Sequence, residues 1–424
     1  MKGIIWCVFA LCWISGFSSG IPSYTLKELE KHFLESNYLL IAQKYQIDQA
    51  AALVVQEKVW SNPTLSISEV NLWNTGSSEQ LPYLFGRFGN TQQISAELEQ
   101  LIETAGKRKK RISIKKLEQN QAVWEYESLL LELKKELRQT YYELQKIHQS
   151  KEQFQKIIEL FNQMYEQYER QSEKENIPKA DFFRVQTERM RLQSEWAAIE
   201  EEELILIQKL QVFTNISDLK TDQVLFENKT TLQLSEKVPF ALNQMIADQN
   251  PTLKKENNTT KLTQQKWELE KAQRTPDLTL QVNYDRGGNI MRDFVGIGFS
   301  IDLPVFNTNK AATKAARFAV EEQSLKFKVA TSELEKETKR LRTQLIYYEK
   351  LLHQWENNPM NEQKELMNNY FKHLQNKQVT LLEFIDFVQA ITEAQQVYFE
   401  MVQNYYRVFE ELQFLAGMDF ETIN

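Results

Sequence analysis

The side chains best suited to chemistry are few and scattered in this sequence. Its four histidines, His32, His148, His353 and His373, fall in separate charged stretches, and no pair has the spacing of metal ligands. No nucleophile, base and metal-binding cluster converge either. We therefore expect no enzyme, no catalytic residue, no metal site and no cofactor, and we interpret each histidine as an ordinary surface or packing residue.

The composition favours long helices. The 424 residues include only 12 glycines and 9 prolines, which predicts long uninterrupted elements. Charged residues make up 26% and the mean hydropathy is −0.52, which excludes a bundle of membrane helices beyond one N-terminal segment. A transmembrane β-barrel stays open, because alternating strands give a weak hydropathy signal. The net charge of −7 gives no reason to expect nucleic acid as a partner.

Residues 1–20 have the pattern of a signal peptide. Lys2 is a positive start, residues 4–17 are largely apolar, and Ser18-Ser19-Gly20 is a small-residue cleavage site. The apolar run is too short for a membrane anchor. Both cysteines of the chain lie in this segment, and we expect neither to carry a lipid. The mature protein is then exported and has no disulfide and no thiolate metal site.

One helix–strand unit occurs twice in the chain. Asn62-Pro63-Thr64-Leu65 precedes the first predicted strand, and Thr275-Pro276-Asp277-Leu278 precedes the second, with the prolines and leucines 213 residues apart. Asn37 and Asn250, in the preceding helices, have the same separation. It shrinks to 202 in the helices that follow, where the apolar seam of 182–210 recurs at 384–412. This pattern predicts an internal duplication.

Each copy is predicted to contain a β-hairpin. The first consists of 64–72, where the alternation is imperfect, and 93–98. In the second, the apolar face consists of Leu278, Leu280, Val282, Tyr284, Val295, Ile297, Phe299 and Ile301. Its polar face includes Thr279, Gln281, Asn283 and Asp285. Such strands suit a boundary between lipid and a water-filled lumen, but a strand half-buried in a soluble sheet shows the same period. Four strands are too few to close a barrel in one chain.

Helices fill most of the remaining chain. Leu117, Trp124 and Leu131 are spaced by seven residues, which indicates a coiled-coil seam in a helix over 103–170. Other helices are expected over 23–60, 179–213, 250–274, 311–374 (irregular near 357–359) and 380–415. The predicted division begins with a signal peptide at 1–20 and a first repeat at 21–213, which contains hairpin 63–98 and helical hairpin 103–213. A connecting segment at 214–240 follows. The second repeat, at 241–415, contains hairpin 276–303 and helical hairpin 311–415, and a tail covers 416–424.

Three charged or polar segments are candidates for contacts. The basic run Lys107–Arg111 is either a solvated helix start or a contact with lipid headgroups. Two polar turns join the long helices, and they consist of Glu173, Lys174, Glu175 and Asn176 in the first copy and Gln375, Asn376, Lys377 and Gln378 in the second. These turns are either exposed loops or a constriction that gates a pore and contacts a partner.

Taken together, these elements resemble the TolC-type outer-membrane efflux protein family over essentially the whole mature chain. The resemblance rests on Pro63 and Pro276 before the strands, Gly106-Lys107-Arg108 after the first hairpin and Leu303-Pro304-Val305-Phe306-Asn307 after the second. Ile177 with Asp181-Phe182, and Val379 with Glu383-Phe384, resemble the family's helical tips. Family tips often carry a glycine where this chain has Glu175 and Lys377.

The resemblance implies a mostly α-helical fold with a membrane β-barrel portion. Three chains would form a homotrimer with one twelve-stranded barrel in outer-membrane lipid, continued by long antiparallel helices in the periplasm. The chain would be a passive conduit in a tripartite efflux system, served by a periplasmic adaptor (membrane fusion) protein and an inner-membrane pump of the resistance-nodulation-division type. Its context around Gly106-Lys107-Arg108 looks most like the heavy-metal cation branch, the outer components of cobalt–zinc–cadmium or copper–silver exporters.

Other interpretations fit the same sequence. A periplasmic coiled-coil structural or adaptor protein would have similar helices, although it would not need two amphipathic hairpins at matching places. An outer-membrane channel for drugs or for type I secretion would share every feature described so far.

Overall fold

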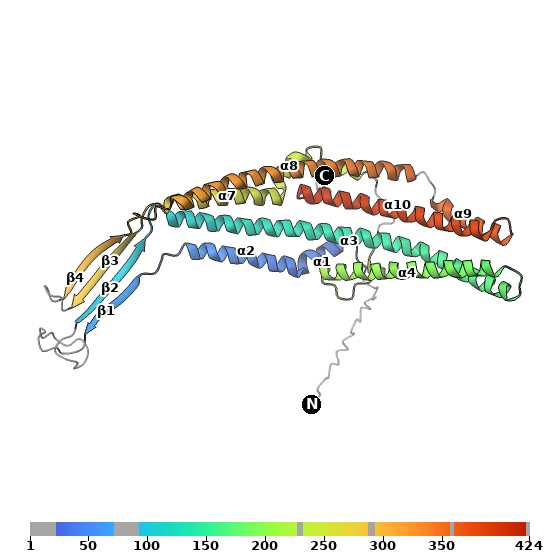
Figure 1. The fold of residues 1–424 in the computed structure, drawn as a ribbon, viewed down its shortest axis with the longest axis horizontal. Coiled ribbons are helices and arrows are strands. Elements are labelled where there is room, and N and C mark those ends of the chain that lie inside the picture. The colour runs from blue at the N-terminus through green and yellow to red at the C-terminus, as the bar shows by residue number, and fades with distance from the viewer. Residues whose placement is uncertain (1–22, 72–92, 227–231, 287–292, 357–359, 421–424) are drawn as a thin grey trace, which may run out of the picture. The chain divides into compact units, whose positions relative to one another are not determined.

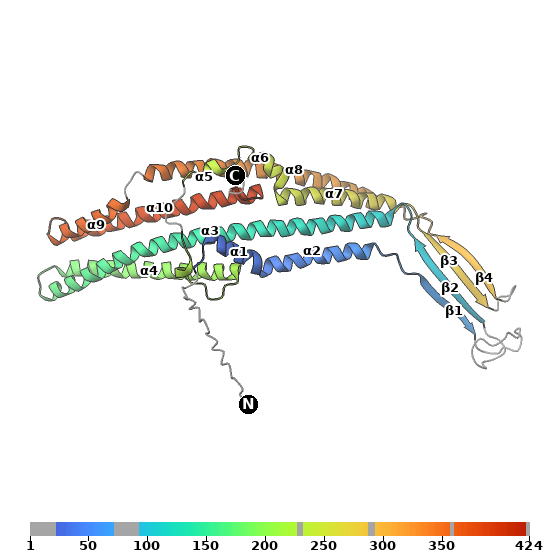
Figure 2. The ribbon, with the colours of Figure 1, turned by 180° about the vertical axis from the view of Figure 1, so that it is seen from behind.

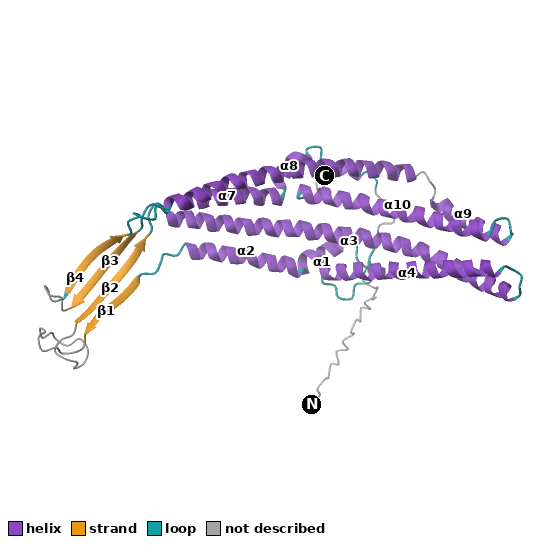
Figure 3. Cartoon of the chain, viewed as in Figure 1, coloured by secondary structure: helices purple, strands orange, loops and turns teal. Residues whose placement is uncertain are grey.

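The computed structural model describes residues 23–71, 93–226, 232–286, 293–356 and 360–420. The predicted signal peptide lies outside these residues. Figures 1 and 3 show the helices and strands of these residues. In chain order the elements are α1 (Leu26–Ser36), α2 (Tyr38–Glu57), β1 (Thr64–Asn71), β2 (Gln93–Ile102), α3 (Lys107–Glu173), α4 (Lys179–Thr214), the 3₁₀ turn η1 (Thr221–Gln223), α5 (Leu234–Lys237), α6 (Leu242–Gln249), α7 (Pro251–Ala272), β3 (Leu278–Arg286), β4 (Phe294–Ile301), α8 (Lys310–Glu356), α9 (Met360–Gln375) and α10 (Leu381–Ala416).

The chain divides into two compact units, which are described separately. The tip unit comprises the described residues of Met1–Asn37, Glu136–Leu232 and Leu351–Arg407. The sheet unit comprises those of Tyr38–Lys135, Gln233–Lys350 and Val408–Asn424. Each unit therefore contains segments from both predicted repeats. No helix within the described residues is long and apolar enough to cross a membrane.

The sheet unit contains one four-stranded antiparallel sheet with the order β1-β2-β3-β4 (Figures 1 and 2). Leu98 of β2 pairs with Leu65 on one side and with Val282 on the other, and Val282 pairs with Ile297 of β4. The register of β1 shifts between Ser68 and Asn71, where Glu69 has a φ of 51°. This irregularity explains the imperfect alternation of the first strand, because a bulge moves later side chains to the other face.

The helices of the sheet unit form a row of neighbours. Arg111 of α3 forms an ion pair with Glu57 of α2 at 2.6 Å. The side-chain amide of Asn258 in α7 donates to the backbone oxygen of Leu117 in α3 at 2.8 Å. Gln323 of α8 donates to Glu256 of α7 at 2.7 Å. The order across the row is therefore α2, α3, α7 and α8.

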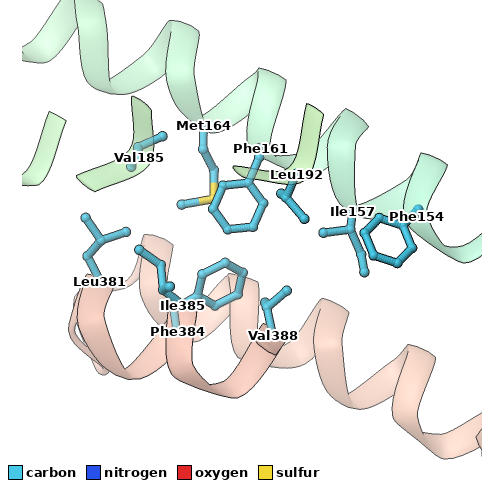
Figure 4. Packing of buried hydrophobic residues seen from close by; sticks show 10 residues of the cluster. All are labelled: Phe154, Ile157, Phe161, Met164, Val185, Leu192, Leu381, Phe384, Ile385 and Val388. Atoms are coloured by element: carbon cyan, nitrogen blue, oxygen red, sulfur yellow. The ribbon is translucent and has the colours of Figure 1, made fainter. Parts of the chain in front are cut away.

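The tip unit is held together by an apolar core (Figure 4). Phe161 and Met164 of α3 are fully buried, and Phe384 of α10 lies opposite them. Val185 and Leu192 of α4 complete the cluster at positions predicted for the apolar seam. Burial of apolar side chains at heptad-like spacing is what fixes two helical hairpins against each other.

The first predicted helix is interrupted. The helix expected over 23–60 breaks at Asn37 between α1 and α2. The side chain of Asn37 donates to the backbone oxygen of Phe213 at 3.1 Å, and Ser36 donates to that of Thr214 at 2.8 Å. These bonds satisfy carbonyls at the C-terminal end of α4 that the helix itself leaves unpaired. The irregularity predicted near 357–359 lies outside the described residues, between α8 and α9.

Equivalent contacts recur at the separations that the sequence predicts. Asn250 donates to the backbone oxygen of Leu415 at 2.8 Å, as Asn37 does to that of Phe213. Asn215 and Gly417, which follow α4 and α10, both have positive φ angles of 56° and 74°. These positions differ by 213 residues before the strands and by 202 after them. The duplication is thus expressed in bonds and backbone angles as well as in residue types.

Candidate functional site

The two faces of the sheet differ sharply in chemistry. Directly paired residues share a face, so Thr279, Gln281, Asn283 and Asp285 lie on the same side as the β2 residues opposite them. The polar face consists of Thr64, Ser66, Ser68, Ser95, Glu97, Glu99, Thr279, Gln281, Asn283, Asp285 and Ser300, with Gly296 and Gly298, and also includes Leu101 and Phe294 at its ends. All four predicted polar-face candidates are therefore brought together on one surface.

Two carboxylates on this face were missed by the sequence reasoning. Glu97 pairs with Asn283, and Glu99 pairs with Gln281, whose side-chain amide donates to Glu99 at 2.7 Å. The sequence carries the signal, because apolar Ile94, Ala96 and Leu98 alternate in this strand, so Glu97 between them and Glu99 after them must point to the other face. The polar face thus carries acidic groups contributed by β2 as well as the β3 residues.

Glycines in β4 make room on the polar face. A side chain at Gly296 would collide with the Asn283 amide, since a Cβ there would lie 2.2 Å from Asn283 Oδ1. Gly298 faces Gln281 with more space. The small residues opposite the apolar stripe of β4 therefore let the long polar side chains of β3 lie across the neighbouring strand.

The opposite face of the sheet is apolar and exposed. It carries all eight predicted residues of the second hairpin, joined by Leu65, Ile67 and Leu98 from the first. Ile297 is 86% exposed and Phe299 is 70% exposed, while Leu278 and Tyr284 are half-buried. A contiguous apolar face of this kind does not stay bare in water, so it indicates contact with lipid or another apolar surface.

A partly buried ion pair fixes the sheet to the helices. Lys107 at the start of α3 contacts Asp277 just before β3 at 2.8 Å, and the backbone N–H of Thr104 also donates to Asp277 at 2.8 Å. Burial opposes ionisation of Asp277, but the Lys107 ammonium and the Thr104 donors outweigh it and hold the pKa of Asp277 below its ordinary value. The Thr104 hydroxyl donates to the backbone oxygen of Pro276 at 2.5 Å.

Most side chains of the basic run Lys107–Arg111 contact other residues of the same chain. Arg108 lies over the Trp60 ring at 4.2 Å, and Lys110 donates to the backbone oxygen of Ala105 at 3.0 Å. Arg111 bonds to Glu103, and that contact together with its bond to Glu57 raises the pKa of Arg111 despite partial burial. With Lys107 also paired, the run serves the sheet–helix junction, and only the exposed Lys109 resembles the solvated helix start that was considered.

The two polar turns share one backbone geometry. Glu173 and Gln375 end their helices, and the residues that follow form the turns. Glu175 and Lys377 have positive φ angles of 59° and 58°, a backbone conformation that favours glycine. In both turns the next residue, Asn176 or Gln378, donates its N–H across the helix end, at 2.9 Å in each case. This arrangement is a Schellman closure without glycine.

The turns differ in how the next helix begins. Thr380 accepts a bond from the Glu383 N–H at 3.2 Å, and Glu383 accepts one from the Thr380 N–H at 2.7 Å. This reciprocal pair lowers the pKa of Glu383, chiefly through the Thr380 N–H. In the first turn, Pro178 precedes α4 and provides no side-chain cap. All four residues of the first turn are exposed, as are Gln375, Asn376, Lys377 and Gln378.

The described residues contain no group of three histidine, cysteine, aspartate or glutamate side chains placed to hold a metal ion. His373 contacts the side-chain oxygen of Gln378 in the second turn. His148 lies beside the Phe226 ring, with centroids 5.1 Å apart. These neighbours are those of packing and surface residues.

The fold matches solved structures of bacterial outer-membrane channels. CusC, whose crystal structures concern folding and transmembrane channel formation, matches with a TM-score of 0.74 and 16% identity over 93% of this chain and 92% of that chain. The Campylobacter jejuni CmeC outer membrane channel matches with 0.74 and 14% over 92% and 85%. The outer membrane protein VceC of Vibrio cholerae matches with 0.71 and 14% over 93% and 96%.

The chain has the TolC-type channel fold. The likeness extends over nearly the whole chain and over most of each neighbour, so it covers the sheet and the helices alike. At identities of 16% and below it establishes the fold and leaves the roles of individual residues to the chain's own geometry. No protein-family model and no curated protein matches the sequence.

Proposed function

We propose that the protein is a passive channel of the Gram-negative outer membrane, the outer component of a tripartite efflux system, with its helices in the periplasm. The observation that carries this proposal is the reversed polarity of the sheet. Large apolar side chains such as Ile297 and Phe299 are exposed, whereas Glu97, Glu99 and Gln281 gather on the other face. Lipid outside and water inside is the environment that such a sheet requires.

We also propose that the channel is a homotrimer. β1 and β4 are the two edges of the sheet, and within the described residues neither has a second partner strand. Open strand edges are unstable in lipid, since their backbone groups find no water to bond. Four strands are too few to close a barrel, but three chains supply twelve. Closure of the ring would satisfy every edge.

The proposed partners are a periplasmic adaptor protein and an inner-membrane pump of the resistance-nodulation-division type. The exposed polar turns at 173–176 and 375–378 are the surfaces that we assign to the adaptor. Their rigid closures, anchored by the buried core beside Phe161 and Phe384, present these side chains on fixed backbones. A defined surface of this kind suits a specific protein contact better than a disordered loop would.

The cargo is proposed only as small substrates. Gly106-Lys107-Arg108, on which the heavy-metal branch was predicted, has a structural role in the sheet–helix junction. The structures of CusC and CmeC match this chain with equal TM-scores, so the likeness in fold does not favour one of them. Deletion of the gene followed by exposure to panels of metal cations, organic toxins and secreted peptides would assign the cargo. Sensitivity to metals alone would support the heavy-metal branch, and sensitivity to organic compounds alone would contradict it.

A periplasmic structural or adaptor protein is the rival proposal. Such a protein would leave the apolar face of the sheet in water, at a cost of about 25 cal/mol for each Å² of apolar surface. Membrane fractionation separates the two proposals. We expect the protein in the outer-membrane fraction as a heat-sensitive trimer, and single-channel steps when it is added to planar lipid bilayers. A soluble monomer without conductance would contradict the channel.

The first turn is the proposed gate. Glu173, Lys174 and Glu175 could link neighbouring helices of a closed pore through their charges. In bilayers, Glu173→Ala combined with Glu175→Ala should then raise the conductance. The control is Gln375→Ala with Gln378→Ala, which changes two uncharged side chains of the second turn and so removes no charge. An unchanged conductance in the first variant would end the gating proposal and leave the channel itself untouched.

A further inference from the structure

Two adjoining grooves lie along α8 in the sheet unit. The first has a volume of about 350 Å³ and lies between α8 and the start of α6. The second is more open, has a volume of about 690 Å³ and continues along α8. Lys336 and Lys339 border both grooves, and Phe240, which precedes α6, borders the first. The two therefore form one concave surface, which we call the α8 groove.

Three cations of the α8 groove have no partner within the described residues. The side chains of Lys336, Lys339 and Arg342 form no ion pair and no hydrogen bond with any of these residues. By contrast, Arg340 of the same helix donates to a carboxylate one turn earlier, at 3.0 Å. Glu335 borders the groove one turn before Lys339, and it forms no ion pair in the described part of the chain either. The groove thus has three unpaired cations against one unpaired carboxylate.

This positive charge is local, and it costs free energy. The whole chain has a net charge of −7, so the groove is not part of a generally basic protein. Lys336, Lys339 and Arg342 follow one another at intervals of three residues, and like charges at this spacing on a helix repel. They extend over about 9 Å of the helix. A ligand with several anionic groups would remove this repulsion, so the charges indicate a polyanion.

The uncharged side chains of the groove suit a sugar. Phe240 is 96% exposed, so its ring offers an apolar face to a ligand. Asn243 borders the same part of the groove, and its side-chain amide makes no hydrogen bond within the described residues. An amide both donates and accepts hydrogen bonds, as sugar hydroxyls require. An apolar face with a few orienting polar groups is the usual composition of a ligand site.

The groove lies far from the sheet. α8 begins at Lys310, shortly after β4 ends at Ile301. Lys339 lies 29 residues after Lys310, which is about 44 Å along the helix. Attraction to charged lipid headgroups falls off over a Debye length, about 8 Å at physiological ionic strength. Lipid around the sheet is therefore too distant to occupy the groove.

We propose that the α8 groove binds a glycan that carries carboxylates. The inference rests on the proposed periplasmic location of the helices, where the polymer with this chemistry is peptidoglycan, since its sugar chains carry peptides with free carboxylates. A sugar ring lies against Phe240, and carboxylates contact Lys336, Lys339 and Arg342. This contact attaches the channel to the cell wall.

An acidic protein segment fits the same surface less well. A helix that docks in a groove needs a row of apolar anchors at helical spacing. The large exposed apolar side chains that border the α8 groove are Phe240 in one part and Tyr347 in the other. Charged Lys336 and Lys339 border the place where the two parts join. Isolated rings separated by cations suit a sugar polymer better than an apolar helix face.

Co-sedimentation with isolated peptidoglycan sacculi tests the proposal on the purified full-length protein in detergent. The test variant combines Lys336→Gln, Lys339→Gln and Arg342→Gln. The matched control combines Lys310→Gln, Lys328→Gln and Lys350→Gln, which removes three exposed charges of the same helix outside the groove. Soluble peptidoglycan fragments and poly-glutamate serve as competitors. Native mass and conductance in bilayers are measured on each preparation.

We expect the unmodified protein and the control to sediment alike. The test variant should bind roughly tenfold more weakly, because each exposed ion pair contributes little but three are lost together. Its binding should also lose most of its dependence on salt. Phe240→Ala should weaken binding and keep that dependence, since it removes no charge.

Four outcomes would contradict parts of this proposal. Equal sedimentation of the test variant and the control would overturn the groove as the binding site. Stronger competition by poly-glutamate than by peptidoglycan fragments would overturn the glycan in favour of an acidic protein segment. Loss of the native trimer in the test variant alone would assign the cations to a contact between copies and overturn the site.

The remaining outcome separates this proposal from the proposed function. A protein that conducts in bilayers but does not sediment with sacculi overturns the glycan site while the channel stands. A protein that sediments but does not conduct overturns the channel while the glycan site stands.

Discussion

The sheet and the core of the tip unit use the same kinds of side chain in opposite ways. Ile297 and Phe299 project from the sheet into exposed positions, whereas Ile157 and Phe161 are buried between helices. If the sheet lies in lipid, apolar side chains are removed from water in both regions, because lipid covers those of the strands and neighbouring helices cover those of the core. The exposed apolar side chains of the sheet and the buried ones of the core therefore follow the same preference, which is to leave water.

The largest expected effect tests the buried side of this comparison. Phe384→Ala removes a fully buried ring that lies near Phe161, Tyr370 and Phe371, with centroids 6.3, 6.5 and 5.8 Å away. We expect the free energy of unfolding to fall by about 3–5 kcal/mol, because the core cannot refill the cavity. Denaturant unfolding in detergent, followed by tryptophan fluorescence, measures it. The exposed Leu382→Ala is the control, and an equal loss there would contradict a specific core.

The next effect tests the exposed side. Ile297→Arg places a charge on the proposed lipid face and should lower folding stability in lipid vesicles by about 2–4 kcal/mol near mid-membrane. Ser66→Arg adds the same charge on the polar face, opposite Glu97, and should be tolerated. Both variants are compared with the unmodified protein by denaturant titration in vesicles. If both arginines are tolerated equally, the apolar face does not contact lipid.

A smaller effect concerns the attachment of the sheet to its helices. Asp277→Asn should cost about 1–3 kcal/mol at neutral pH, because the carboxylate accepts charge-assisted bonds from Lys107 and Thr104. The folded-state pKa of Asp277 is lowered, so its stabilising contribution is present above the ordinary carboxyl pKa of about 4 and is lost as pH falls through the folded value. The stability difference between the two proteins should therefore shrink below pH of about 4. A constant difference across this range would show that charge is not its source.

The smallest effect concerns the turns beside the core. Lys377→Gly and Glu175→Gly should each stabilise the protein by up to about 1 kcal/mol, because glycine adopts a positive φ without the steric cost that other residues bear. Lys174→Gly is the control, at a position without a positive φ, and should not stabilise. Thermal unfolding of the three variants compares them. Destabilisation by both substitutions at the positive-φ positions would mean that the Glu175 and Lys377 side chains make contacts worth more than the strain.

The accuracy of the sequence-based predictions varied with how local the cause was. The strands of the second hairpin and the two faces of β3 were correct, because side chains alternate along any strand regardless of its neighbours. The break at Asn37 was missed, since its cause lies in carbonyls of α4 that are distant in sequence. Glu97 and Glu99 were not among the predicted polar-face residues, although the alternation along β2 places both of them there.

The roles of the basic run and of the turns depended on partners that the sequence does not reveal. The sequence of Lys107–Arg111 suggested contact with either solvent or lipid headgroups. Three of its charged side chains instead contact Asp277, Trp60 and Glu57. Glu175 and Lys377 stand where glycine would adopt a positive φ most easily, yet both turns have a glycine-type closure. In both cases the local sequence was compatible with several environments, and distant residues selected one.

By itself, the sequence determined the period of each element and the duplication, because alternation, heptad spacing and a constant separation between repeats are properties of the chain alone. The tertiary structure decided which strands pair across the repeats, where the first predicted helix breaks and which charges are used internally. Those outcomes depend on hydrogen bonds and packing between residues such as Asn37 and Phe213, or Lys107 and Asp277, whose proximity only the folded chain creates.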